Sequence, residues 1–174
     1  QVEGLGTQPK ILICYFAQPR ENWEEKYPAQ IASILEDMPE GVTPTFTLAM
    51  PASFANECKE ADIIYCQGGD DQLAMLRFGA FDLPKIWDDK RVSTNSASSD
   101  ILCQSFWPCD WRECMEGLGV LPIRFIPHFN SDWGIDDPRG PIDWNKAREE
   151  LEHFGDQNLP IHALEEGNFI VIEQ

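Results

Sequence analysis

Positive charge is scarce in this sequence. Among 174 residues, 13 Lys and Arg stand against 30 Asp and Glu, so the formal net charge is −17 at pH 7. A negatively charged surface repels phosphates, which makes nucleic acids and anionic membrane surfaces poor partners. It favours cationic substrates. No apolar run approaches the roughly 18 residues of a membrane span, and the first residues show no secretory signal pattern. We expect a cytoplasmic protein.

Closely spaced metal ligands are also missing. The six cysteines form no C-x-x-C pair, and a zinc site would bring closer spacing with Cys or His partners. Cys14 and Cys66 lie inside apolar, strand-like runs, where cysteine serves as a small hydrophobic residue. We therefore expect reduced thiols and neither a metal nor another cofactor.

Apolar side chains are plentiful, and segments with the pattern of a strand alternate along the chain with segments that have the spacing of a helix. Hydrophobic residues make up 43% of the chain, enough for the core of one domain over residues 1–174. Strands are predicted over Ile11–Phe16, Val42–Met50, Asp62–Cys66, Arg91–Asn95, Val120–Pro127, Leu159–Leu164 and Asn168–Ile172. Helices are predicted from Asn22 to Met38, where Asn22 and Glu25 would form a capping box, over Pro51–Glu60, Asp70–Phe78 and Ala97–Gln104, and after Asp143. This alternation predicts an α/β fold with parallel strands and helical crossovers.

Ser96 lies where a predicted strand meets a predicted helix, in Thr94-Asn95-Ser96-Ala97-Ser98. A serine on such a sharp turn projects its hydroxyl from the sheet edge, and the first helical N–H groups point at what it attacks. This is the geometry of a nucleophile elbow. The elbow usually has glycine two residues on either side of the nucleophile, where this chain has Thr94 and Ser98. An ordinary turn in which Ser96 or Ser98 caps the helix remains the alternative.

A glycine pair follows another predicted strand. Gly68 and Gly69 come directly after Asp62–Cys66, at the carboxyl edge where sites of parallel sheets form. Backbone N–H groups of Gly69, with Gly68 as a second candidate, and of Ala97 could hold an oxyanion. The alternative for the glycines is a tight turn.

His128 is the candidate general base for Ser96. Of the three histidines, it alone directly follows a predicted strand and so faces the same edge. An acid or amide should fix its tautomer, and the candidates are Asp110, in the aromatic loop Ser105–Cys114, and Asp132. A solvated loop aspartate is the alternative for both, and the more so for Asp132.

Together these motifs resemble the peptidase E and cyanophycinase-like serine peptidases, which have a class I glutamine amidotransferase-like fold. The resemblance rests on Gly-Gly after DIIYC, the Ser-Ala elbow, GLGVLPIRFIPHF and ALEEGNFIVIE, and the opening ILICYFAQPRENWEEKY is similar to small bacterial members. It covers Ile11 to Glu173 and implies a flavodoxin-like, three-layer α/β/α sandwich with a mostly parallel sheet. It also implies that this chain lacks the first strand–helix unit and the last strands of relatives, and the first strand could be missing from the native protein or only from this chain.

The resemblance also implies roles by position. Ser96 matches the nucleophile, His128 the family's histidine, and Gly68 and Gly69 the oxyanion glycines. Asp110 falls close to the third member of the triad, although its loop differs. Glu166 matches a turn beside the site, with a structural or substrate-binding role. The family's elbow reads Gly-x-Ser-Ala-Gly, so Thr94 and Ser98 are departures that bear on activity.

The sequence thus predicts a serine hydrolase that cleaves small peptides or amides through an acyl-enzyme on Ser96. The rival is a catalytically silent binding domain on the same fold. A substrate carboxylate could be bound by an arginine, and the candidates are Arg77, Arg112 and Arg124. Each is equally plausible as a surface ion. Glutamine amidotransfer is disfavoured because no cysteine occupies the elbow. A homo-oligomer stays open, since a missing edge element would leave an unpaired strand.

Overall fold

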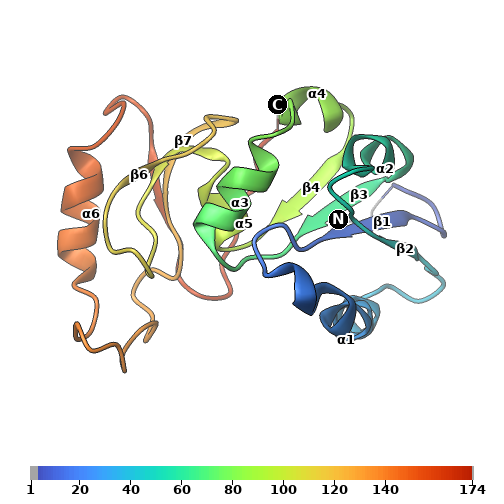
Figure 1. Cartoon of the computed structure of the whole chain (residues 1–174), viewed down its shortest axis with the longest axis horizontal. Coiled ribbons are helices and arrows are strands. Elements are labelled where there is room, and N and C mark those ends of the chain that lie inside the picture. Colours follow the sequence, from blue (N-terminus) through green and yellow to red (C-terminus); the bar gives the residue numbers. More distant parts are fainter. Residues whose placement is uncertain (1–3, 174) are drawn as a thin grey trace. The chain divides into compact units, whose positions relative to one another are not determined.

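The computed structural model describes residues 4–173, which form two compact units (Figure 1). The first unit spans Gln1–Ser98 and the second Ser99–Gln174, and each is described by itself. Each unit holds one four-stranded sheet. The prediction that the whole chain is one domain stays a prediction.

The first unit is built on a parallel sheet with the strand order β2-β1-β3-β4. Its strands are β1 (Lys10–Cys14), β2 (Thr45–Leu48), β3 (Ile63–Cys66) and β4 (Arg91–Thr94). Its helices are the 3₁₀ turn η1 (Arg20–Asn22), α1 (Trp23–Glu36), α2 (Phe54–Glu60), α3 (Asp71–Phe78) and α4 (Leu83–Ile86), and the short α5 (Ala97–Asp100) leads into the second unit.

The central strands β1 and β3 are mostly apolar because both of their faces are covered. Residues 11–14 of β1 are all buried. Beyond β1, Phe16 stacks on Trp23 at 5.7 Å and packs against Phe54 and Phe78 at 4.7 and 5.1 Å between ring centroids. This aromatic cluster fixes the loop after β1 against α1, α2 and α3.

The second unit carries a mixed sheet with the order β6-β5-β7-β8. Its strands are β5 (Cys103–Phe106), β6 (Met115–Glu116), β7 (Leu121–Ile126) and β8 (Ile161–Ala163), and only the β5–β6 pair is antiparallel. The helix α6 (Trp144–Glu152) packs through Ala147 and Leu151 against Trp107 and Ile126. The predicted α/β class with mostly parallel strands is confirmed.

Three local predictions are wrong. The helix predicted over Ala97–Gln104 ends at Asp100, and Cys103–Phe106 instead pairs with β7, which buries Cys103 and Phe106. The segment 168–172 forms no strand, because the sheet ends at β8 within the described residues and leaves Phe169 81% exposed. Asn22 does precede α1, but its side chain makes no cap hydrogen bond.

The described residues contain no helix with both the length and the apolar character needed to cross a bilayer.

Arg124 is a structural residue, so its interpretation as a surface ion is wrong. Its side chain leaves β7 and is buried, with 5% of the residue exposed. The guanidinium donates to five main-chain carbonyls, those of Leu151, Glu152, Phe154, Gln157 and Leu159. A cation at the end of α6 also complements the negative end of the helix. Arg124 therefore ties the chain after α6 to the sheet.

We expect Arg124→Leu to lower the free energy of unfolding by about 3 kcal/mol, because it leaves several buried carbonyls without donors. Arg148→Leu is the control, because Arg148 lies on α6, the helix whose end Arg124 binds. Its side chain is 54% exposed and pairs with Glu152 in the contacts described. It should change stability by less than about 0.5 kcal/mol. Urea denaturation of both variants checks this, and equal losses would contradict the role of Arg124.

Candidate functional site

Three strands of the first unit end in the same row of the sheet. Cys14 is in register with Cys66, and Cys66 with Thr94. The pairing continues one residue further, since the N–H of Gln67 donates to the carbonyl of Cys14 at 2.9 Å and that of Asn95 to Cys66 at 3.3 Å. The loops that follow β1, β3 and β4 therefore leave side by side at the carboxyl edge, where sites of parallel sheets form.

Ser96 occupies a left-handed turn between β4 and α5, with φ of 45°. A residue other than glycine pays about 1–2 kcal/mol for this conformation, so it persists only where the surroundings impose it. The N–H of Ser98 donates to the carbonyl of Asn95 at 3.1 Å and closes the turn. The sharp turn predicted at Ser96 is thus present, with Ala97 as the first residue of α5.

Ser98, which stands where the nucleophile-elbow pattern has glycine, is accommodated rather than crowded. It is buried, and its hydroxyl donates to the main-chain carbonyl of Gln67 at 2.6 Å. This hydrogen bond fastens the start of α5 to the loop after β3. The departure from the glycine pattern is therefore built into the packing of the elbow.

Gly68 lies directly against the elbow. A Cβ on Gly68 would come within 2.8 Å of the Cβ of Ser96, so only glycine allows this approach. The N–H of Gly68 donates to Oδ1 of Asn95 at 2.5 Å. Because this donor is already engaged, Gly69 is the better candidate of the two for an oxyanion donor.

Gly69 is pressed against the loop that follows β1. Its φ is +151°, and a Cβ would lie 2.3 Å from the carbonyl oxygen of Ala17. Gln18 donates through Nε2 to the carbonyl of Gly68 at 2.9 Å. Arg77 donates to the carbonyls of Phe16 and Gln18, both at 2.6 Å, so Arg77 holds this loop in place and its interpretation as a surface ion is wrong.

We expect Gly69→Ala to lower the free energy of unfolding by about 3 kcal/mol or more, because the new Cβ would collide with backbone. Gly41→Ala is the control, since Gly41 also has a left-handed φ, +82°, but open space around it. It should cost only about 1 kcal/mol. Chemical denaturation measures both, and equal costs would show that the loops at this edge are not closely packed.

In the second unit, His128 follows β7 and is held by a carboxylate. Its φ is 54°, and its Nδ1 is hydrogen-bonded to Oε1 of Glu166. Because a carboxylate only accepts, Nδ1 carries the proton, which leaves Nε2 as the acceptor when the ring is neutral. The N–H of Phe129 donates to the carbonyl of Leu164 at 2.8 Å, so the ends of β7 and β8 run together and bring Glu166 to the histidine.

An indole ring covers one face of His128. The ring of Trp133 stacks on the imidazole, with 4.3 Å between centroids and 17° between planes. Trp133 in turn donates through Nε1 to Oδ1 of Asp110 at 3.2 Å. Asp110 is thus connected to His128 through Trp133, and its role as the orienting acid stays a prediction. Asp132 is exposed on the loop that carries Trp133.

The resemblance places Glu166 at a turn beside the site with a structural or substrate-binding role, and it does not predict the contact with His128. The signal that points to it is the pairing of two parallel strands: the chain after β8 leaves at the same edge as the chain after β7. A carboxylate three residues past β8 can therefore reach a histidine two residues past β7. Trp133 gave no such signal, because its loop has no regular period.

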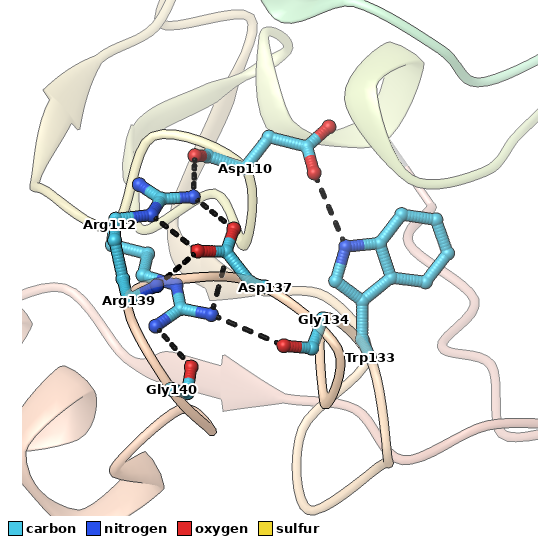
Figure 2. A network of polar contacts seen from close by, with 7 residues as sticks. All are labelled: Asp110, Arg112, Trp133, Gly134, Asp137, Arg139 and Gly140. Atoms are coloured by element: carbon cyan, nitrogen blue, oxygen red, sulfur yellow. Dashed lines mark hydrogen bonds and ion pairs between the residues drawn. The ribbon is translucent and has the colours of Figure 1, made fainter.

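The loop that carries Trp133 is fastened by a carboxylate between two arginines (Figure 2). Arg139 donates to both oxygens of Asp137 at 2.9 and 2.7 Å, and Arg112 lies 3.8 Å from the same carboxylate. The hydrogen bonds from Arg139 hold the pKa of Asp137 well below its usual range. Arg112 also donates to the carbonyl of Gly140 at 2.7 Å and is mostly buried, so it is not a surface ion either.

None of the six cysteines is placed as a nucleophile. None forms a disulfide, and five are buried. Burial raises the pKa of Cys58 to about 12 and that of Cys114 to about 11, and it raises those of Cys14 and Cys103 as well. Within residues 4–173, no group of three or more His, Cys, Asp or Glu side chains could hold a metal ion.

Comparison with solved structures identifies the fold. A peptidase from an acI-B1 actinobacterium superposes with a TM-score of 0.58 over 92% of this chain and 68% of its own, at 21% identity. A protein assigned to peptidase E from Listeria monocytogenes EGD-e gives 0.60 over 91% and 79%, at 11% identity. No protein-family model matches the sequence, and no curated protein matches it significantly. The predicted resemblance to peptidase E-like proteins is confirmed for the fold, that of an α/β/α sandwich.

Proposed function

We propose that this protein is a serine hydrolase that cleaves small peptides or related amides through an acyl-enzyme on Ser96. The observation that carries the proposal is the left-handed turn of Ser96 between a parallel strand and a helix. A non-glycine residue in this conformation stores strain that an ordinary connection does not need. At the edge of a parallel sheet, the turn exposes a hydroxyl to a substrate.

The mechanism assigns a role to each group. Nε2 of His128 takes the proton of Ser96 Oγ as the hydroxyl attacks the carbonyl carbon, and returns it to the leaving amine. Glu166, bonded to Nδ1, keeps the proton of the neutral ring on that nitrogen and stabilises the imidazolium. The N–H groups of Gly69 and Ala97 hold the oxyanion, and water then releases the acyl group. The proposal requires that Ser96 of the first unit meet His128 of the second.

Two further considerations support it. Both solved neighbours are described as peptidases, and their fold is that of this chain. Arg77, Arg112 and Arg124 are all engaged by main-chain carbonyls, so none of the three is a ready partner for a substrate carboxylate. We therefore infer that these three arginines do not select the substrate by binding a carboxylate on it. We also infer a cytoplasmic location, in which six thiols that form no disulfide stay reduced.

The rival function, a silent binding domain, has one observation in its favour. The N–H of Gly68 already donates to Asn95, so it is not available as a donor to an oxyanion. Such a domain would keep the fold and bind a ligand at this edge without reacting.

A fluorophosphonate probe separates the two functions. We expect the probe to form an adduct on Ser96, located by mass spectrometry, and to form none in Ser96→Ala. His128→Ala should slow labelling by at least about a hundredfold, because the hydroxyl loses its base. Ser99→Ala is the control for a neighbouring serine and should label normally. Absence of an adduct under conditions that label a known serine hydrolase would favour the silent domain.

Glu166 and Asp110 compete for the role of orienting acid, and matched amides distinguish them. We expect Glu166→Gln to reduce the labelling rate by about a hundredfold or more, because an amide favours the wrong tautomer of His128. Asp110→Asn keeps an acceptor for the indole N–H, so its rate should stay within about threefold of the wild type. The opposite order would assign the acid to Asp110.

A further inference from the structure

We propose that Trp133 is a positioning residue for His128: its indole ring and the carboxylate of Glu166 together hold the imidazole in one orientation, and Asp110 contributes by holding the indole. The inference rests on the proposed function, which needs the histidine as a base. It adds a residue that neither the motifs nor the fold assigns.

The stack and the hydrogen bond constrain different motions. The bond from Nδ1 to Glu166 fixes one point of the ring but lets the ring rock about that bond. A flat indole at 4.3 Å and 17° closes one face and removes this freedom. The side chain of His128 is only 16% exposed, while that of Glu166 is 62% exposed and would by itself be a mobile anchor. The stacking and the hydrogen bond therefore restrict the imidazole in complementary ways.

Trp133 is held both at its indole ring and at its main chain. Its Nε1–H, a donor that cannot accept, is bonded to Oδ1 of Asp110 at 3.2 Å. The main-chain N–H of Trp133 donates to the hydroxyl of Ser131, also at 3.2 Å. Figure 2 shows the indole turned toward the Asp110 carboxylate. Asp110 thereby gains a defined function at the site without serving as the acid of a triad.

The surrounding loop is braced to the segment that carries Asp110. Arg139 donates to the main-chain carbonyl of Asp110 at 2.9 Å and to Asp137, and Arg112 donates to the carbonyls of Gly134 and Gly140 (Figure 2). These bonds join residues 110–112 to residues 134–140. Trp133 is 42% exposed, and the braced loop holds its ring against His128.

The test compares three variants by two independent measurements. Trp133→Leu removes the flat ring, Trp133→Phe keeps a flat ring but loses the bond to Asp110, and Trp111→Leu makes the same change at a neighbouring tryptophan, 39% exposed. The first measurement is the fluorophosphonate rate on Ser96, separated into probe binding and the maximal rate. The second is the tautomer of the His128 ring, read by ¹⁵N NMR at a pH where the ring is neutral and assigned with His128→Gln.

For Trp133→Leu we expect about a tenfold lower maximal rate with unchanged probe binding, and an Nε2–H tautomer that the wild type lacks. Trp133→Phe should stay within about threefold, and Trp111→Leu should match the wild type in both measurements. Thermal unfolding of all variants verifies that they fold. A wild-type rate and tautomer in Trp133→Leu, or equal losses in Trp111→Leu, would overturn the proposal.

The two proposals fail in different ways. If the wild type itself is not labelled, the proposed hydrolase function fails, and the positioning role is then decided by the tautomer alone. A mixed tautomer in Trp133→Leu would support the positioning role, and an unchanged one would overturn it. If labelling occurs but does not depend on Trp133, only the positioning proposal fails.

Discussion

The in-register parallel pairing of β1, β3 and β4 is the constraint on which the first unit depends. Because Cys14, Cys66 and Thr94 end their strands in one row, three loops emerge together at the carboxyl edge. Their close approach then dictates residue types. Gly68 has no room for a side chain beside Ser96, and Gly69 has none beside the loop after β1. The left-handed turn of Ser96 follows from the same crowding, since the chain must turn sharply from β4 into α5.

In the second unit, loops also come together at one edge of the sheet, but there they are joined by side-chain contacts and not by closely packed glycines. Parallel pairing of β7 with β8 brings the chain after each strand to one edge, and there Glu166 binds His128. Trp133 covers the imidazole, and a network of Arg112, Asp137 and Arg139 fixes the loop that supplies it. Buried cations serve the scaffold: Arg124 satisfies the carbonyls after α6. Although the chain is negatively charged overall, Arg77, Arg112 and Arg124 hydrogen-bond to main-chain carbonyls.

The sequence predicts the parts of this architecture that depend on local pattern. Apolar runs such as residues 11–14 identify buried parallel strands. The ends of these runs mark the ends of the strands, which is why the sequence could place Gly68, Gly69, Ser96 and His128 there. Strand β5 could not be predicted, since its pairing with β7 overrides the helical pattern that begins at Ala97. The contact of Trp133 with His128 depends on an irregular loop, and no period in the sequence reports such a contact. The mostly exposed residues 168–172 have strand character but pair with no strand among the described residues, which only the sheet order reveals.

The proposed mechanism requires His128 to act as the base for Ser96, and ³¹P NMR of the phosphonylated protein tests that requirement most directly. A phosphonate on Ser96 places a phosphorus atom where the substrate carbonyl would lie, so its chemical shift senses the charge of a nearby imidazole. The account predicts a ³¹P resonance that shifts with pH in the wild type and is independent of pH in His128→Gln, after prolonged reaction with the probe. A resonance that does not respond to pH in the wild type would contradict the account.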